Sequence, residues 1–348
     1  MKTRLKALAA ASAACALLTS QAVVAEEGHT EIARQHWSFG GFTGQFDKAQ
    51  LQRGFLVFKQ VCSNCHGLKR LYFRNLVQPG GPEFDEEAVK KLAAEWPNQI
   101  PELNDQGESA VTNKDKDNKT VPGFTYVKRP PKLSDPILGP YANDLQARAA
   151  QNGRVPPDLT LIAKARNVER DPSWYAHPFL MLGDIGNAYQ EGGADYIDAL
   201  LTSYDKPLPK FQRDDKGKLA LLGEGSTEGG KPAGSKAEEC ASVVKGDDGQ
   251  PDTCNALQEG LYYNPAFAGH QIGMPPPLSD GLLTAQDGYP LEPVVDNYAR
   301  DVVAFLSWAG DPTLNQRKRI GWQVMLYLLV TTVLLYLGKK RLWSQTKH

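Results

Sequence analysis

Two cysteines and a histidine stand together in the sequence Cys62-Ser63-Asn64-Cys65-His66. The spacing Cys-x-x-Cys-His is the attachment signature of c-type haem. Cysteines three residues apart lie on one helical face, so both thiols can reach the two vinyl groups of one porphyrin. The adjacent imidazole can then bind the iron. The alternative is a redox or zinc Cys-x-x-Cys pair that a histidine follows by accident, but the motif by itself favours haem.

The motif supplies only one axial ligand, and the second ligand decides between electron transfer and small-ligand chemistry. The chain has four methionines, of which one is the initiator and one, Met325, lies in an apolar segment near the C-terminus. Met274 precedes three consecutive prolines, which fix the backbone and can hold a thioether rigidly. We therefore favour Met274 over Met181, which lies in an ordinary apolar run. His270 and His177 are the histidine alternatives.

A helix is expected to lead into the Cys-x-x-Cys-His motif. Residues 47–61 (DKAQLQRGFLVFKQV) place apolar side chains at helical spacing, and Gly54 would let a second helix approach closely. Residues 296–308 (DNYARDVVAFLSW) are the natural partner, with Asp296 as the expected cap. Two terminal helices that cross at a glycine are typical of class I c-type cytochromes. We therefore predict a mainly α fold, a class I c-type cytochrome-like haem domain with long loop insertions.

The sequence between these helices is rich in turn signals and poor in strand patterns. Residues 84–96 (FDEEAVKKLAAEW) predict a short helix with an acidic first turn. Acidic groups at its start are a hypothetical docking patch for a basic partner, namely Glu83, Asp85, Glu86 and Glu87. Residues 99–122 are polar and predict an excursion from the core.

Residues 1–25 have the pattern of a secretory signal peptide. A basic start precedes a small apolar run and the cleavage-site shape Val23-Val24-Ala25. The alternative is an uncleaved anchor helix, but the apolar run is short, rich in alanine and interrupted by polar residues. We expect cleavage after Ala25 and export of the mature chain.

Residues 320–338 (IGWQVMLYLLVTTVLLYLG) carry no charge and predict a transmembrane anchor. At 1.5 Å per residue the run spans roughly 28 Å, close to the thickness of the bilayer core. A buried core helix is the alternative, which the basic clusters on both sides disfavour. Because the signal peptide exports residues 26–319, the tail 339–348 should be cytoplasmic, in a bacterial inner membrane that the chain crosses once.

The chain has 348 residues and a formal net charge of −1, so it shows no nucleic-acid-binding footprint. Of its five cysteines, Cys15 leaves with the signal peptide and two serve the haem motif. Cys240 and Cys254 remain, and an oxidising compartment favours their pairing over two free thiols. The disulfide would close a loop of about 15 residues, worth roughly 3 kcal/mol in the chain-entropy model.

Several short segments, in this order and with these spacings, resemble the cytochrome c1 family over nearly the whole mature chain. They are WSF at 37–39, LQRG at 51–54, CSNCH at 62–66, YFRNL at 72–76, RAAQNG at 148–153, PPDL at 156–159, YYNPAF at 262–267, MP at 274–275, DVVAFLSW at 301–308 and KRLW at 340–343.

The resemblance implies one covalent haem c and a role for each site residue. Cys62 and Cys65 would form the thioethers, His66 would be the proximal ligand and Met274 the distal ligand. Arg148 would pair with a haem propionate, for which a guanidinium offers a bidentate fork.

The chain departs from the family pattern in two places. Gln151 and Arg154 flank the Asn-Gly step where the family usually has asparagine and alanine, and Arg154 adds a charge near the expected haem edge. The segment 212–258, which precedes the Tyr-Asn-Pro sequence, resembles a flexible insertion.

The family resemblance implies a membrane-anchored electron carrier that is not an enzyme on its own. It would take an electron from the Rieske iron–sulfur protein and pass it to cytochrome c, beside cytochrome b in a dimeric bc1 complex, with the haem domain on the periplasmic side. Two alternatives stay open: an anchored monohaem cytochrome subunit of another respiratory oxidase, and a haem enzyme or gas sensor with an open sixth position.

Overall fold

The computed structural model describes residues 32–101, 111–114, 120–126, 128–166, 168, 192–214, 218–221, 237–246 and 250–344. The expected signal peptide, Met181 and His177 lie outside these residues. The chain divides into two compact units. The larger comprises Thr30–Lys206, Glu259–Phe267 and Gln271–His348, and the smaller includes Pro207–Gln258 and Ala268–His270.

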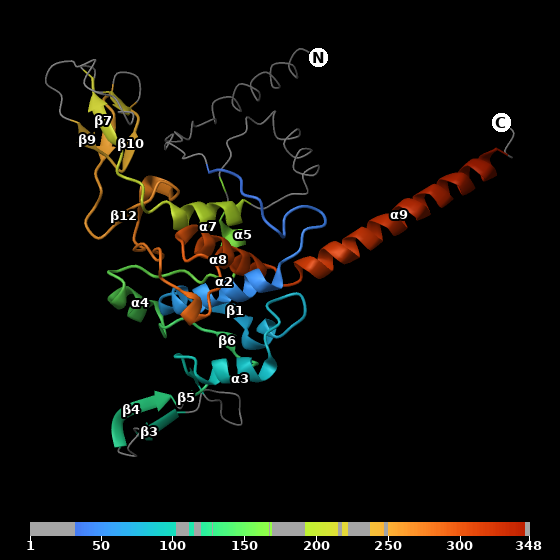
Figure 1. Ribbon diagram of the computed structural model, residues 1–348, viewed down its shortest axis with the longest axis horizontal. Helices are drawn as coiled ribbons and strands as arrows, with labels where there is room; N and C mark the ends of the chain where they lie inside the picture. Colours follow the sequence, from blue (N-terminus) through green and yellow to red (C-terminus); the bar gives the residue numbers. More distant parts are fainter. Residues whose placement is uncertain are drawn as a thin grey trace, which may run out of the picture. The chain divides into compact units, whose positions relative to one another are not determined.

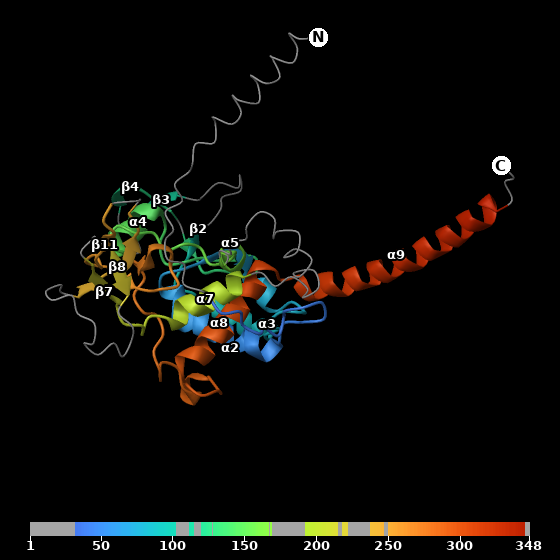
Figure 2. The ribbon, with the colours of Figure 1, turned by 90° about the horizontal axis from the view of Figure 1, so that it is seen from above.

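Two helices form the centre of the larger unit. Helix α2 (Lys48–Gln60) leads into the haem motif, and helix α8 (Val295–Gly310) crosses it; they lie side by side in both views (Figures 1 and 2). A Cβ at Gly54 would lie 2.0 Å from the carbonyl oxygen of Asp301 and 2.7 Å from Cβ of Phe305. The predicted crossing of two helices at a glycine is confirmed, and so is the mainly α, cytochrome-like fold.

The two helices begin differently. The Asp47 carboxylate caps α2 and accepts hydrogen bonds from the backbone N–H groups of Ala49 and Gln50. The expected cap of α8 by Asp296 is wrong, because that residue lies inside the first turn of the helix. The carboxylate of Asp280, from the preceding loop, accepts from Val295 N at 2.9 Å and satisfies this end instead.

Aromatic rings and one buried ion pair hold the crossing together. The ring of Phe55 lies 5.5 Å from that of Phe305, and both belong to the main apolar cluster. Asp301 is 2% exposed. It accepts from Arg53 Nε at 2.8 Å and Nη2 at 3.0 Å, and from the hydroxyl of Tyr289 at 2.8 Å. A buried carboxylate needs such full pairing, so this network fixes the angle between α2 and α8.

Shorter helices surround this pair. The helix expected over residues 84–96 is present as α3 (Glu86–Ala94), with Asp85 as its cap. The others are α4 (Asp144–Ala150), α5 (Ile162–Ala165) and α7 (Gly193–Thr202), together with the 3₁₀ turns η1 (Cys62–Asn64), η2 (Phe73–Leu76) and η4 (Ala285–Asp287). A further 3₁₀ turn, η3 (Ala268–His270), belongs to the smaller unit.

The described residues also form six small antiparallel sheets, where the sequence shows few strand patterns. These strands are two to seven residues long and pair loop edges, so they need no alternating apolar face. The pairs are β1 (Leu68–Tyr72) with β6 (Pro136–Ile137), β2 (Ile100–Pro101) with β5 (Lys128–Arg129), β3 (Val111–Lys114) with β4 (Thr120–Tyr126), β10 (Ser242–Val244) with β11 (Thr253–Asn255) and β12 (Tyr262–Tyr263) with β13 (Gln271–Ile272); β7 (Lys210–Arg213) lies between β8 (Leu219–Leu221) and β9 (Glu238–Glu239).

Helix α9 (Leu314–Trp343) follows α8 after a short turn and is long and apolar enough to cross a membrane (Figure 1). It extends the anchor expected from the sequence by several residues at each end. Its first turns are bound to the N-terminal segment of the larger unit. Lys318 Nζ donates to the carbonyl oxygens of Phe39 and Gly41, both at 2.6 Å, and of Gly44 at 3.1 Å. Helix α9 is therefore joined directly to the domain that carries the haem motif.

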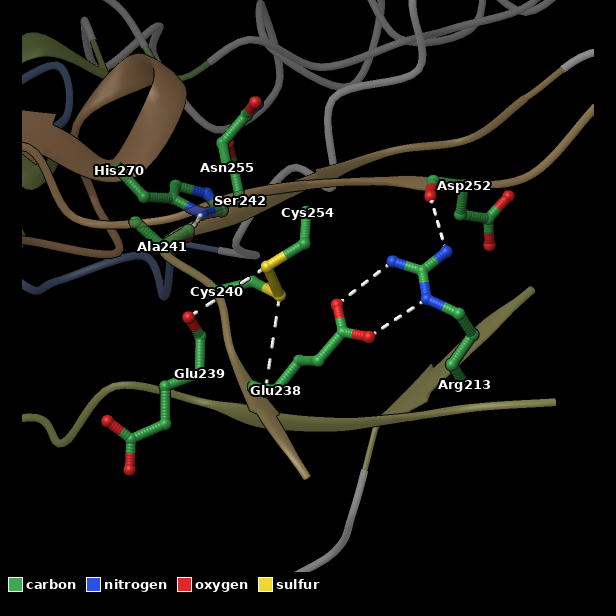
Figure 3. Close-up of a disulfide and its surroundings, with 10 residues drawn as sticks. All are labelled: Arg213, Glu238, Glu239, Cys240, Ala241, Ser242, Asp252, Cys254, Asn255 and His270. Carbon is green, nitrogen blue, oxygen red and sulfur yellow. Dashed lines mark hydrogen bonds and ion pairs between the residues drawn. A yellow bond between two sulfur atoms is a disulfide. The ribbon is translucent and has the colours of Figure 1, made fainter. Parts of the chain in front are cut away.

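A disulfide joins Cys240 and Cys254 in the smaller unit, with a Cα–Cα distance of 5.4 Å (Figure 3). Beside it the Arg213 guanidinium makes two 2.9 Å hydrogen bonds to Glu238 and a 2.8 Å bond to the carbonyl oxygen of Asp252. The disulfide and the Arg213–Glu238 ion pair thus hold together the described parts of the segment 212–258. These contacts compensate for the segment's lack of large apolar side chains.

Helix α7 carries two buried carboxylates in the larger unit. Asp195 Oδ1 accepts from Trp37 Nε1 at 2.7 Å and from Gln35 N at 3.1 Å, which ties the N-terminal segment to the helix. Asp198 is 7% exposed, and among the described residues its Oδ1 has no hydrogen-bond partner. Burial of the Asp198 carboxylate disfavours its charged form.

The substitution Asp198→Asn is expected to raise the free energy of unfolding at pH 7 by about 2–3 kcal/mol. Burial raises the pKa of Asp198 from 3.8 to about 6; the charges of Asp296 and Asp195 add to the shift and that of Arg300 opposes it. Because the raised pKa favours the protonated folded state, the wild-type chain loses stability as pH rises from about 4 through about 6.

The difference in the free energy of unfolding between Asp198→Asn and the wild type should therefore grow as the pH rises through that window and vanish below it. Denaturant unfolding of the full chain in detergent, followed by tryptophan fluorescence at several pH values, measures it. A difference that does not change with pH would contradict the assignment.

Candidate haem site

The Cys-x-x-Cys-His motif follows α2 as a single 3₁₀ turn. Cys65 N and His66 N both donate to the carbonyl oxygen of Cys62, at 3.1 and 2.8 Å. The thiols of Cys62 and Cys65 are half-buried and are not joined to each other. Burial raises the pKa of Cys62 to about 12, so this thiol stays protonated in the apoprotein. The turn presents two unpaired thiols and one imidazole together, as covalent haem attachment requires.

The imidazole of His66 is held through one ring nitrogen. Its Nδ1 lies 2.7 Å from the carbonyl oxygen of Pro157, which makes Nδ1–H the donor and leaves Nε2 with a lone pair. Burial lowers the pKa of His66, while the bond to Pro157 acts in the opposite direction. The neutral, oriented ring that results is the form that binds a metal.

The segment 151–160 lies against the motif and forms one wall of the site. Leu159 N donates to the carbonyl oxygen of Gly67 at 2.9 Å, and Lys69 N donates to Asp158 Oδ2 at 2.7 Å. Gln151 Nε2 lies 3.5 Å from Cys65 Sγ. Gln151, one of the two residues that differ from the usual family pattern, thus contacts Cys65 directly.

Met274 lies in the loop after β13, at the other end of this wall. Its carbonyl oxygen accepts from the hydroxyl of Tyr204, just beyond α7, at 3.1 Å. The neighbouring Gly273 packs on Arg154, since a Cβ at that glycine would lie 2.1 Å from Arg154 Cδ. The segment that holds Pro157 against His66 therefore also contacts the segment that carries Met274.

The histidine alternative His270 has a hydrogen-bond partner within its own unit. His270 belongs to the smaller unit, where its Nδ1 lies 3.0 Å from the carbonyl oxygen of Ala241 (Figure 3). This contact gives no support to His270 as the second axial ligand. Met181 and His177 fall outside the described residues.

Arg148 is exposed on α4, and its Nη1 donates to the carbonyl oxygen of Gly153 at 3.0 Å. This bond caps the end of its own helix and uses one donor of the guanidinium; pairing of Arg148 with a haem propionate stays a prediction. Sequence reasoning did not consider Arg166, at the end of α5, whose charge lowers the pKa of Tyr196 on α7 against a larger increase from burial. The sequence does not show that the Arg166 guanidinium lies near the Tyr196 phenol, because 30 positions separate the two residues.

The acidic groups at the start of α3 all have local partners. Glu83 pairs with Lys48 at 3.2 Å, and Glu86 and Glu87 both pair with Lys90, at 2.9 and 2.8 Å. The fourth group, Asp85, caps the helix. Because lysines lie among these carboxylates, the patch attracts a basic partner less strongly than the sequence alone suggests.

The residues present fit a c-type haem. The segment 151–160 contacts Cys65 through Gln151 and His66 through Pro157, and its Arg154 packs on Gly273, the residue before the half-buried Met274. Sulfur and imidazole are the ligands that low-spin haem c uses in electron carriers. A zinc site would need three or four ligand atoms close to one another. Among the described residues such a group is found only at Glu238, Cys240 and Cys254, and not at the Cys-x-x-Cys-His turn.

Comparison with known proteins agrees with this chemistry. Residues 37–346 match the family model for the Cytochrome C1 family. The chain is 38% identical over 313 residues to cytochrome c1 of Blastochloris viridis, covering 90% of this chain and 86% of the relative. It is 35% identical over 340 residues to cytochrome c1 of Rhodospirillum rubrum, covering 97% and 96%.

A third relative is longer. The cytochrome b/c1 of Bradyrhizobium diazoefficiens is 34% identical over 346 residues, which cover 97% of this chain and 40% of that protein. Together the matches confirm the resemblance seen in the sequence. The chain belongs to the cytochrome c1 family: it is a c-type haem protein, with the haem held covalently through cysteine, and an electron-transfer subunit of the bc1 complex.

Proposed function

We propose that this chain takes one electron at a time from a Rieske iron–sulfur protein and passes it to a cytochrome c. The observation that carries the proposal is the shared wall, in which the segment 151–158 contacts both the His66 side and the Met274 side of the site. When bound, haem c supplies one-electron redox chemistry at its iron. No substrate bond is made or broken on this chain.

Each site residue has a holding or orienting task. Cys62, the first residue of η1, and Cys65, the residue just after it, would tether the porphyrin through thioether bonds. His66 would bind through Nε2, because Pro157 occupies Nδ1. Met274 would supply the second ligand to the iron, and a histidine–methionine pair raises the reduction potential and excludes small ligands.

Ligands held by the fold need little rearrangement when the electron arrives. The Pro157 contact fixes the imidazole plane, and Tyr204 fixes the backbone at Met274. A small rearrangement lowers the cost of each transfer, which favours a relay over a catalytic site with an open position.

A membrane anchor would keep the haem domain close to its electron donor. Helix α9 would hold the haem domain beside cytochrome b at the membrane surface, and the name cytochrome b/c1 of one relative is consistent with that neighbour. We further propose that the signal peptide 1–25 exports the haem domain to the periplasmic side, that the tail 339–348 is cytoplasmic, and that the complex is dimeric.

Purification of the affinity-tagged full chain from its native membrane tests the assignment. A Rieske protein and a cytochrome b should copurify with it, and the haem should be reduced when quinol is added and reoxidised by cytochrome c. Copurification with the subunits of a terminal oxidase in place of these two partners would contradict the proposal. It would favour the alternative of an anchored cytochrome subunit of another respiratory oxidase.

A further inference from the structure

An uncharged segment of the larger unit precedes helix α2. Residues 37–46 (WSFGGFTGQF) carry no charged side chain, in a chain of which 23% of the residues are charged. Three of its four aromatic side chains, those of Trp37, Phe39 and Phe46, are buried or half-buried. The fourth, Phe42, is 65% exposed. Neither the haem site nor the electron relay uses this segment, so its exposed ring needs another explanation.

The base of the segment is closed tightly, and its tip is open. The rings of Phe39 and Phe46 lie 4.7 Å apart and pack on the main apolar cluster. Above them the chain folds back on itself, since a Cβ at Gly44 would lie 1.8 Å from the carbonyl oxygen of Gly40. The turn 40–44 therefore presents Phe42 on a backbone whose two ends are fixed.

Two side chains of α9 hold this turn. Lys318 Nζ donates to three carbonyl oxygens of the segment, and two of them, at Gly41 and Gly44, lie on either side of the exposed phenylalanine. Asn315 Oδ1, almost one turn earlier on α9, accepts at 3.1 Å from the backbone N–H of Phe46. The turn is thus bonded to the beginning of α9, which leaves the domain at this point (Figure 1).

These bonds place the turn near the membrane surface, given the anchoring by α9 proposed above. Lys318 precedes the uncharged run 320–338 by two residues, roughly 3 Å along the helix. The headgroup layer beside the hydrocarbon core is roughly 5–8 Å thick, so the turn lies within it. Trp322 is 71% exposed and follows Lys318 by four residues, which puts both on one face of α9. Exposed aromatic side chains at this depth are typical of a membrane interface.

We propose that the turn 40–44 contacts the phospholipid surface and that Phe42 inserts into the lipid, as a second membrane contact beside α9. A single exposed phenylalanine is ordinary on a protein surface. Here it belongs to a segment without charges to desolvate, and it is bonded to the helix that enters the membrane. Two contacts fix the tilt of the haem domain over the membrane, whereas a single helix leaves the domain free to rock.

The test compares three cysteine variants of the mature full chain with haem, reconstituted in nanodiscs of phosphatidylcholine and phosphatidylglycerol. Phe42→Cys reports on the turn, whose backbone Lys318 still holds. Trp322→Cys is the control within the membrane. Leu291→Cys is the matched control in water, because Leu291 is 41% exposed in the same unit and precedes α8 at the end away from α9, a helix length of roughly 24 Å.

Each thiol is treated with N-cyclohexylmaleimide, which enters lipid, and with a sulfonated maleimide, whose charge confines it to water. Mass spectrometry measures both rates. The ratio of the apolar to the sulfonated rate cancels differences in thiol reactivity. We expect this ratio at position 42 to exceed that of Leu291→Cys several-fold and to approach that of Trp322→Cys.

Equal ratios at positions 42 and 291 would overturn the inference. Two fast reactions at position 42 would then assign the turn to water, and two slow ones would assign it to a protein contact. A raised ratio at position 322 alone would remove only the second contact and leave the anchor in place. A low ratio at position 322 as well would overturn the anchor together with this inference. Unchanged thermal unfolding shows that the three variants remain folded.

Discussion

Replacement of Met274 by leucine is expected to lower the midpoint reduction potential by hundreds of millivolts, within the ~0.8 V range that axial ligands control. Leucine fills a similar volume but offers no sulfur, so the loop that Tyr204 and Arg154 hold should keep its place. The iron then loses the thioether ligand, which disfavours its oxidised form, and the reduction potential falls. Potentiometric titration of the purified full chain measures the change.

The matched control is Met325→Leu, the same replacement at a side chain exposed on α9. It should leave the potential unchanged. Met274→Leu should also make the iron accessible to carbon monoxide and stop turnover with cytochrome c. An unchanged potential in Met274→Leu would point to a different sixth ligand.

The substitution Gly54→Ala is expected to destabilise the chain by about 3 kcal/mol or to prevent its accumulation. The added methyl group would lie 2.0 Å from the carbonyl oxygen of Asp301, a backbone atom that cannot move without shifting α8. Separation of the helices would also strain the buried Arg53–Asp301 pair, whose loss is costly.

Gly310→Ala is the control for this prediction. It lies at the end of α8, where the nearest described atoms to an added Cβ would be Thr160 O at 3.4 Å and flexible atoms of Lys164 beyond it. We expect its stability to stay within about 0.5 kcal/mol of the wild type. Chemical unfolding of both variants compares them, and equal stability of Gly54→Ala and the wild type would refute the tight crossing.

Local pattern predicted the parts of the fold that periodicity encodes. The apolar spacing in residues 47–61 and 296–308 gave both core helices, and Gly54 marked their crossing before any contact was known. The uncharged run 320–338 predicted the long apolar helix α9. These features depend on residues close in sequence, so the sequence shows them directly.

Long-range contacts escaped sequence reasoning. Pro157 lies 91 residues from His66, and the contact of Arg154 with Gly273 crosses 119 positions, so nothing local signals either. The short strands escaped because they pair loop edges without an alternating pattern. The pairing of Glu83 with Lys48 escaped for the same reason, since Lys48 lies on α2.

The most direct test of the account is the optical spectrum of the purified full chain in both oxidation states, recorded during a potentiometric titration. We predict a low-spin haem c with a methionine–iron charge-transfer band in the oxidised form, one haem per chain and a positive midpoint potential. A five-coordinate, high-spin spectrum, or a low-spin spectrum without that band, would show that Met274 does not close the axial position and would contradict the relay.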